Sequence, residues 1–164
     1  MLKIYLDSSA LTKRYLYEAG SSAVDEIFRG AEAGELVVVF SIWNVGEVLG
    51  VLDTRCRRRW LSEGEFAKAL RVFTDEIIKL LRLRSIVVVP AFTSILIEAW
   101  SMVLNSHIYE ADALQLSTCN YSQSNAFLSE DGELVSVARQ IGLKAFNVVR
   151  EEKEIKLFIK GNCA

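Results

Sequence analysis

The chain opens with Met1-Leu-Lys-Ile-Tyr-Leu-Asp7, a short apolar run that ends in an acid and is followed by Ser8 and Ser9. The run has the length of one strand, and its side chains suit burial on both faces, which predicts a strand of a parallel sheet. In open sheets of this kind, ligands bind beyond the carboxyl ends of the strands. Asp7 is therefore the first candidate for a functional side chain.

Four more apolar runs predict strands of the same sheet. They are Leu36-Val-Val-Val-Phe40, Ile86-Val-Val-Val89, Ala126-Phe-Leu128 and Leu143-Lys-Ala-Phe-Asn-Val-Val149. Helical patterns lie between them, over residues 9–17, 22–33, 42–60, 62–82, 93–105, 109–120 and 133–141. Strands that alternate with one or two helices predict an α/β/α three-layer sandwich around a parallel sheet of four to five strands. Because Asp7 and Asp131 both follow strands, those two strands are expected to be neighbours.

Length and composition limit the class of protein. The chain has 164 residues, 51% apolar and 24% charged, which predicts one folded domain rather than a disordered segment. We expect no membrane span and no secretory signal, since Asp7 interrupts the first apolar run so early. Cys56, Cys119 and Cys163 show no CxxC spacing and are expected to be reduced thiols in a cytoplasmic protein. With one histidine, a zinc site is not expected.

Four acids occupy positions that such a sheet would bring to one end: Asp7, Glu47, Asp112 and Asp131. Each has a simpler explanation when taken alone, because Asp7 and Asp131 suit helix N-caps and Glu47 suits a solvated helix face. Clustered carboxylates are unfavourable unless something positive binds between them. Taken together, they predict a site for a divalent cation such as Mg²⁺ or Mn²⁺, which prefer oxygen ligands.

Glu47 and Asp112 fall inside predicted helices, among apolar or small neighbours. Gly46 and Gly50 lie one turn apart and leave a bare stripe beside Glu47, through which another backbone or a ligand can approach. Asp112 interrupts an apolar stripe, and aspartate is a poor helix former. A buried carboxylate at that position needs a cation, a basic partner or several hydrogen-bond donors.

Basic side chains are concentrated in one segment. Residues 55–84 hold nine of the 19 lysines and arginines against four acids, so this segment has a charge of +5 and the remainder −7. Such a distribution suits a phosphate-binding flank beside an acidic site. A solvated helical surface or a partner interface explains the same charges, and both interpretations stay open.

In order and spacing, these motifs resemble those of PIN-domain ribonucleases, in particular the VapC-type toxins of toxin–antitoxin pairs. The residues that carry the resemblance are Tyr5-Leu-Asp-Ser-Ser-Ala-Leu-Thr-Lys-Arg-Tyr15 followed by Glu18-Ala-Gly20-Ser, Glu47-Val-Leu, Arg57-Arg-Arg-Trp-Leu-Ser-Glu-Gly-Glu-Phe66, Ala111-Asp-Ala-Leu-Gln-Leu116 and Leu128-Ser-Glu-Asp131. The resemblance covers about residues 1–149, the expected nuclease domain. Residues 150–164 are expected to form a C-terminal extension, helical or partly disordered. One departure is Gln115, where the third motif commonly has histidine.

The resemblance implies a PIN-like sandwich and a metal-dependent endoribonuclease that uses Mg²⁺ or Mn²⁺. Asp7 and Asp112 would ligate the metal directly, and Glu47 and Asp131 directly or through water. Ser8 and Ser129 would support the acids, with the Ser129 hydroxyl helping to place Asp131. The side chains expected to contact RNA are Arg57, Arg58, Arg59 and Trp60.

The implied partners are an RNA substrate, an antitoxin protein and a second copy of the chain. Exposed apolar residues on the helical pair 42–82 are expected to bind one of the two proteins. A PIN protein that processes RNA, or an inactive RNA-binding scaffold, is the alternative function. Aspartyl phosphatases, receiver domains and P-loop enzymes are disfavoured because their motifs are missing from the sequence. His107 precedes a helix and suits a surface or cap position better than catalysis.

Overall fold

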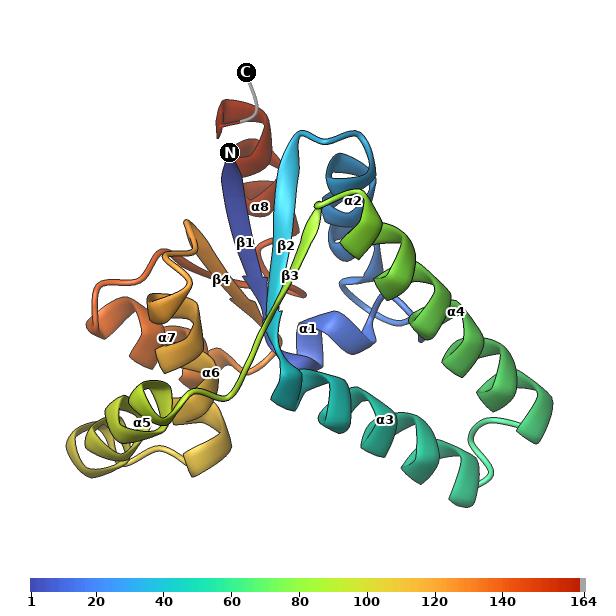
Figure 1. Ribbon diagram of the computed structural model, residues 1–164, viewed down its shortest axis with the longest axis horizontal. Helices are drawn as coiled ribbons and strands as arrows, with labels where there is room; N and C mark the ends of the chain where they lie inside the picture. The colour runs from blue at the N-terminus through green and yellow to red at the C-terminus, as the bar shows by residue number, and fades with distance from the viewer. Residues whose placement is uncertain (163–164) are drawn as a thin grey trace.

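Five parallel strands form the central sheet of the protein, whose computed structural model describes residues 1–162 (Figure 1). The strand order is β3-β2-β1-β4-β5. The strands are β1 (Leu2–Leu6), β2 (Leu36–Ser41), β3 (Ile86–Val89), β4 (Ala126–Ser129) and β5 (Ala145–Asn147). β1 pairs with β2 on one side and with β4 on the other, which confirms the predicted neighbours.

Alternating side chains of each inner strand enter two separate cores. On β2, Leu36, Val38 and Phe40 join the core on one face, and Val37 and Val39 join the core on the other. All six residues of β2 are buried, as expected for a strand covered on both faces.

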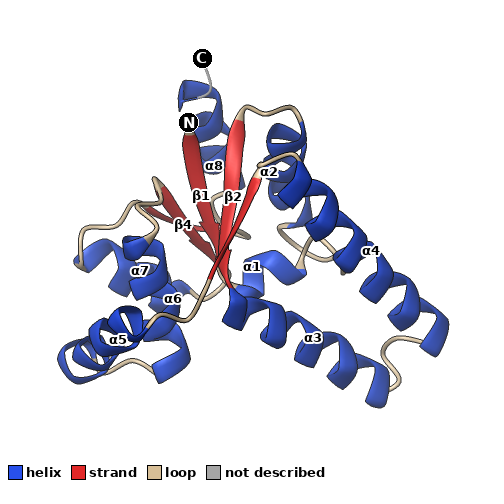
Figure 2. Cartoon of the chain, viewed as in Figure 1, coloured by secondary structure: helices blue, strands red, loops and turns tan. Residues whose placement is uncertain are grey.

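Helices cover both faces of the sheet and complete the predicted three-layer sandwich (Figure 2). One layer holds α5 (Thr93–Ser106), α6 (Glu110–Tyr121) and α7 (Gly132–Gln140). The other holds α1 (Ser8–Thr12), α2 (Ser21–Glu32), α3 (Ile42–Arg57), α4 (Glu63–Arg82) and α8 (Glu152–Asn162). The helices α3 and α4 form a long hairpin that projects away from the sheet (Figure 1). The strand ends that precede α1, α3 and α7 lie at one edge of the sheet, where the acids were predicted to meet.

Three elements are shorter than predicted: α3 ends at Arg57, about three residues early, and two short elements cover about half of their predicted ranges because side chains bind the backbone at their ends. The helix expected over residues 9–17 ends at Thr12, since Ser21 Oγ donates to the carbonyl oxygen of Lys13 at 2.7 Å. The strand expected over residues 143–149 spans only Ala145–Asn147. Asn147 Oδ1 there accepts from the backbone N–H groups of residues 149 and 150 and turns the chain out of the sheet.

Helix α8 lies within the segment expected as a C-terminal extension. Its Ile155 and Ile159 are buried, and the helix packs against α2 and β5. Cys56 and Cys119 are free thiols, whereas Cys163 and the rest of residues 163–164 lie outside the described residues. Among residues 1–162, no helix combines the length and the apolar character needed to cross a membrane.

Candidate active site

Asp7 lies at the carboxyl end of β1 and begins α1 as its N-cap. The side chain is only 5% exposed, and its Oδ1 accepts from Ser9 Oγ at 2.7 Å and from the backbone N–H of Ala10 at 2.8 Å. Burial raises the pKa of Asp7 to about 6 and the charge of Glu47 adds to the rise, whereas Ser129, Ala10 and Ser9 oppose it. Asp7 is thus the predicted helix cap, and it is also a carboxylate whose charged form is disfavoured by burial and by the charge of Glu47.

Asp112 lies in the first turn of α6 and is half-buried. Its pKa is raised by burial first, and then by the charges of Asp131 and Glu47. Within residues 1–162 its carboxylate accepts no hydrogen bond. Among the described residues, this half-buried carboxylate has neither a basic partner nor a hydrogen-bond donor, which leaves water or a cation to satisfy it.

Asp131 and Glu47 each use one carboxylate oxygen to bind neighbouring groups. Asp131 is exposed and caps α7, where its Oδ1 accepts from the backbone N–H groups of Glu133 and Leu134 at 2.8 and 3.2 Å. The backbone N–H of Asp131 donates to Ser129 Oγ at 2.9 Å, the contact expected of a serine that places this acid. Glu47 is half-buried on α3, and its Oε2 accepts from Ser8 Oγ and from Gln115 Nε2.

The four predicted acids act on one another electrostatically. Glu47 raises the pKa of Asp7, and Asp131 and Glu47 together raise that of Asp112, so none of the four stands apart. No three acids, histidines or cysteines of residues 1–162 stand close enough to enclose an ion directly. The set nevertheless fits Mg²⁺ or Mn²⁺, because all four ligands are oxygens and Mg²⁺ keeps several waters between itself and the protein.

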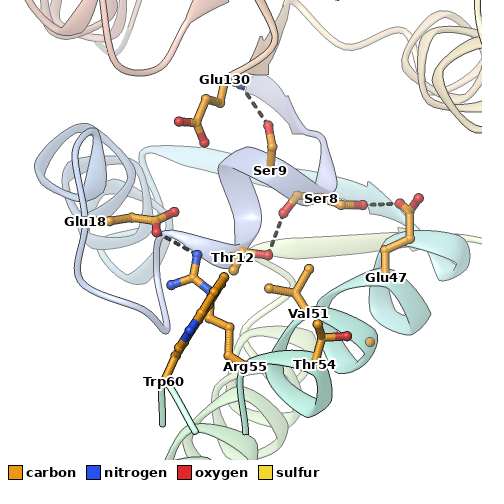
Figure 3. Close-up of a pocket in the computed structure, with 11 residues that line it drawn as sticks. Ser8, Ser9, Thr12, Glu18, Glu47, Val51, Thr54, Arg55, Trp60 and Glu130 are labelled. Carbon is orange, nitrogen blue, oxygen red and sulfur yellow. Dashed lines mark hydrogen bonds and ion pairs between the residues drawn. The ribbon is translucent and has the colours of Figure 1, made fainter. Parts of the chain in front are cut away.

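A groove of about 670 Å³ begins at Ser8 and Glu47 and runs along α1 to the turn between α3 and α4 (Figure 3). Gly50 lines it, and a side chain added at Gly46 or Gly50 would meet no other atom within 4 Å. The glycine stripe is therefore open to solvent, and no other backbone of the described residues packs against it. Arg55 and Trp60 close the far end of the groove, and Arg55 pairs there with Glu18 at 2.8 Å.

The four residues predicted to contact RNA are not all on this groove. Trp60 lines it and is 66% exposed, with the guanidinium of Arg58 over its ring at 5.2 Å. Arg57 pairs with Asp53 one turn earlier, and Arg59 lines a different depression. Arg55, which was not among the predicted RNA contacts, is the arginine that faces the groove.

Several side chains that support the site were not among the predicted site residues. Asn44 and Gln115 are buried and contact Ser8, and Gln115 also contacts Glu47. The spacing in the sequence could have predicted both residues. Asn44 lies three positions before Glu47, and Gln115 lies three positions after Asp112, so each shares a helix face with an acid of the site.

Lys13 is also buried, being 2% exposed. It binds Glu18 at 3.1 Å and Glu130 at 2.7 Å, next to Asp131. No periodicity marks this lysine in the sequence. His107, by contrast, caps α5 in a left-handed conformation, as the preference for a cap position suggested.

Comparisons with known proteins give fold similarity alone. No protein-family model matches the chain, and no curated protein matches it. The structure is similar to VapC20 of Mycobacterium tuberculosis, a sarcin–ricin loop cleaving toxin, with a TM-score of 0.58 and 16% identity over 82% of this chain and 94% of the other. It is similar to FitAcB of Neisseria gonorrhoeae, with a TM-score of 0.64 and 16% identity over 90% of this chain and 99% of the other.

A third similar structure is PAE2754 of Pyrobaculum aerophilum, with a TM-score of 0.64 and 17% identity over 95% of this chain and 90% of the other. All three matches span nearly the whole of the compared chain, so the likeness is not confined to a shared sheet. The resemblance to PIN-domain, VapC-type toxins is therefore confirmed at the level of the fold: the chain is a PIN-like α/β/α sandwich.

Proposed function

We propose that the protein is a metal-dependent endoribonuclease, the toxin component of a toxin–antitoxin pair. The observation that carries the proposal is the placement of Asp7, Glu47, Asp112 and Asp131 at the carboxyl edge of the sheet, where Glu47 raises the pKa of Asp7, and Asp131 and Glu47 raise that of Asp112. A fold keeps four such acids together at a cost in stability, which a bound divalent cation offsets. The fold similarity to a toxin described as cleaving the sarcin–ricin loop supports RNA as the substrate.

Asp7 and Asp112 are the proposed direct ligands, with Glu47 and Asp131 binding directly or through water. When bound, Mg²⁺ or Mn²⁺ supplies Lewis-acid chemistry, by making a water molecule more acidic and by offsetting the charge that develops on a phosphate. The protein itself contributes by holding the carboxylates of the site in fixed orientations. The helix cap at Asp7 fixes its Oδ1, and the contacts to Glu47 fix its Oε2.

The groove is the proposed path of the RNA strand away from the acids. Trp60 offers an exposed ring at its far end, and base stacking on an aromatic side chain holds single strands without sequence preference. The groove itself carries Glu18, Glu47 and Glu130 against Arg55, so phosphates gain little there from charge. Stacking and the cation, rather than a general basic surface, are therefore the proposed sources of RNA affinity.

A pair of substitutions on α6 tests the proposal. Asp112→Asn removes a proposed ligand, and Glu110→Gln removes an exposed acid two positions away on the same helix. With labelled RNA and 5 mM Mg²⁺ or Mn²⁺, we expect Asp112→Asn to lose at least about 100-fold in cleavage rate, because even residues that only support metal ligands contribute 10–100-fold. Glu110→Gln should cleave like the unsubstituted protein, and EDTA should abolish cleavage by both it and the unsubstituted protein.

Cleavage that persists in EDTA, or in Asp112→Asn at the unsubstituted rate, would contradict the proposal. A protein that binds RNA but never cleaves it would support the alternative of an inactive PIN scaffold. A toxin is separated from an RNA-processing nuclease by its partner, and a small neighbouring gene that encodes an inhibitor of the cleavage would establish the toxin.

A further inference from the structure

A buried network of neutral side chains lies beneath Glu47 and joins four elements of the fold, β1, α1, α3 and α6. Gln115 of α6 is 3% exposed, and its Nε2 donates to Glu47 Oε2 at 2.8 Å and to Ser8 Oγ at 3.2 Å. Its Oε1 accepts from the hydroxyl of Tyr5 at 2.8 Å and from Asn44 Nδ2 at 2.7 Å. The amide of Gln115 thus makes all four of the hydrogen bonds that it can form.

The network also dictates the direction of the Ser8 hydroxyl. Ser8 Oγ accepts from Asn44 Nδ2 at 2.8 Å and from Gln115 Nε2, and these two donors occupy both of its lone pairs. The hydroxyl proton is then left for Glu47 Oε2, the contact drawn in Figure 3. Ser8 is therefore a fixed donor to Glu47 rather than a freely rotating hydroxyl.

Both donors bind the same oxygen of Glu47. Ser8 and Gln115 each contact Oε2, and Oε1 has no hydrogen-bond partner within residues 1–162. Two donors on one oxygen remove the freedom of the carboxylate to turn about its last bond. Glu47 is held so that Oε1 is the oxygen available to a ligand of the site.

The donors to Glu47 are neutral, whereas two other glutamates of the fold, the half-buried Glu18 and the buried Glu76, are paired with cations. Glu18 binds Lys13 and Arg55, and Glu76 binds Arg14 through both of its oxygens. An arginine or lysine would cancel the charge of the carboxylate that it orients. Neutral amide and hydroxyl donors orient Glu47 and leave its charge available to attract a cation.

We propose that Gln115 is a positioning residue for the divalent cation: it fixes Glu47, directly and through Ser8, with Oε1 toward the metal. The proposal rests on the proposed function, because it assumes that a cation binds at the four acids. In this proposal Gln115 is not itself a ligand of the cation, and it acts through its contacts with Glu47 and Ser8. Partners of this kind, which bind metal ligands rather than the metal, change affinity by about 10–100-fold when they are replaced.

The test uses Gln115→Met, which keeps the length of the side chain and removes both polar ends. Tyr5→Phe is the matched control, since it removes a hydroxyl from the inner end of the same network without touching Glu47 or Ser8. Mn²⁺ affinity is measured by titration with detection of the free ion by electron paramagnetic resonance, and thermal unfolding in EDTA is measured alongside. We expect Gln115→Met to weaken Mn²⁺ binding at least 10-fold, and Tyr5→Phe to bind within about 3-fold of the unsubstituted protein.

A second readout separates positioning from a general loss of structure. Raising the Mn²⁺ concentration should restore RNA cleavage by Gln115→Met to near the unsubstituted rate, because the four acids are intact. If the methionine variant does not fold, Gln115→Asn serves instead, since its amide is one methylene too short to reach Glu47. Unchanged Mn²⁺ affinity in the folded variant would overturn the inference and leave the proposed function standing. Absence of Mn²⁺ binding by the unsubstituted protein would overturn both.

Discussion

Asp7 caps its helix with only one of its two carboxylate oxygens. Oδ1 accepts the hydrogen bonds that cap α1, and Oδ2 takes no part in that cap. Asp131 caps α7 in the same way through its Oδ1. A helix cap and a metal ligand are thus compatible in one aspartate, and the cap holds the carboxylate in place at the end of its strand.

The raised pKa of Asp7 makes stability depend on pH. Its pKa is about 6 in the folded protein, above the ordinary value of 3.8, so folding favours the protonated form. The stability that the neutral acid contributes is complete below pH 4 and is lost as the pH rises through 6. A difference of about two pKa units corresponds to at most about 3 kcal/mol in the metal-free protein.

Asp7→Asn removes this charge and keeps the cap, because asparagine caps helices as well as aspartate does. We expect the variant to be more stable than the unsubstituted protein at pH 8 in EDTA, by about 1–3 kcal/mol, and equal to it at pH 4. Urea unfolding at the two pH values measures the difference. If the variant is less stable than the unsubstituted protein at pH 8, the charged form of Asp7 does not destabilise the folded protein.

Lys13 connects the end of α1 to the loop that carries Asp131. Its ammonium group binds Glu130 and Glu18, while Ser9 Oγ accepts from the backbone N–H of Glu130 at 2.8 Å. Two contacts from the first helical segment thus fix the residue before Asp131. Contacts with the distant residues Ser9 and Lys13 therefore help to fix the conformation of this loop.

Replacing Lys13 with methionine should therefore destabilise the protein. We expect a loss of about 2–3 kcal/mol, less than the 3–5 kcal/mol typical of a broken buried pair, because Glu130 can turn to water. Lys156→Met is the control, since it breaks surface pairs worth less than about 1 kcal/mol. Equal unfolding midpoints in urea for the two variants would show that the Lys13 pairs contribute no more than surface pairs.

The elements of the fold that could be predicted from the sequence are those set by local patterns. Continuous apolar runs located all five strands, and Ser62 begins α4 with a capping box to Glu65. The early end of α1 could not be predicted, because it depends on Ser21 binding a carbonyl group eight residues earlier. The burial of Glu76 on α4 also could not be predicted from the sequence, because its partner Arg14 lies far from it along the chain.

The same division holds for the candidate site. Asp7 and Asp131 were predicted because they follow strands, Glu47 because it borders a glycine stripe, and Asp112 because it interrupts an apolar stripe. The pairing of β1 with β4 then brings the first two together. The amide network could not be predicted, because Tyr5, Asn44 and Gln115 come from β1, α3 and α6 and meet only in the folded protein. In the sequence, Gln115 stands out only as a departure from a motif, whereas in the fold its hydrogen bonds to Glu47 and Ser8 place it in the site.

At the scale of the whole molecule, exposed apolar residues lie on the α3–α4 hairpin, where a protein partner was expected to bind, and a second set lies on α5. Ile97, Trp100 and Leu104 are spaced three and four positions apart on α5, and all three are exposed. Apolar stripes that include a tryptophan are typical of protein interfaces. The homodimer implied by the family resemblance would cover such a stripe.

We predict that the protein is a dimer at micromolar concentration and that Trp100→Glu makes it a monomer, because a buried charge opposes association. Sedimentation equilibrium measures the mass of both proteins, and Tyr17→Glu, which replaces another exposed aromatic residue, is the control. A monomeric unsubstituted protein, or a dimer that persists in Trp100→Glu, would contradict this assignment of the α5 face.

The central claim is that Asp7, Glu47, Asp112 and Asp131 share a divalent cation. Crystals grown with Mn²⁺ and measured where manganese scatters anomalously test it most directly. The claim predicts an anomalous peak about 2.2 Å from carboxylate oxygens of Asp7 and Asp112, with Glu47 and Asp131 bound to the same ion directly or through water. No peak among the four acids at millimolar Mn²⁺, or a peak only elsewhere on the protein, would contradict it.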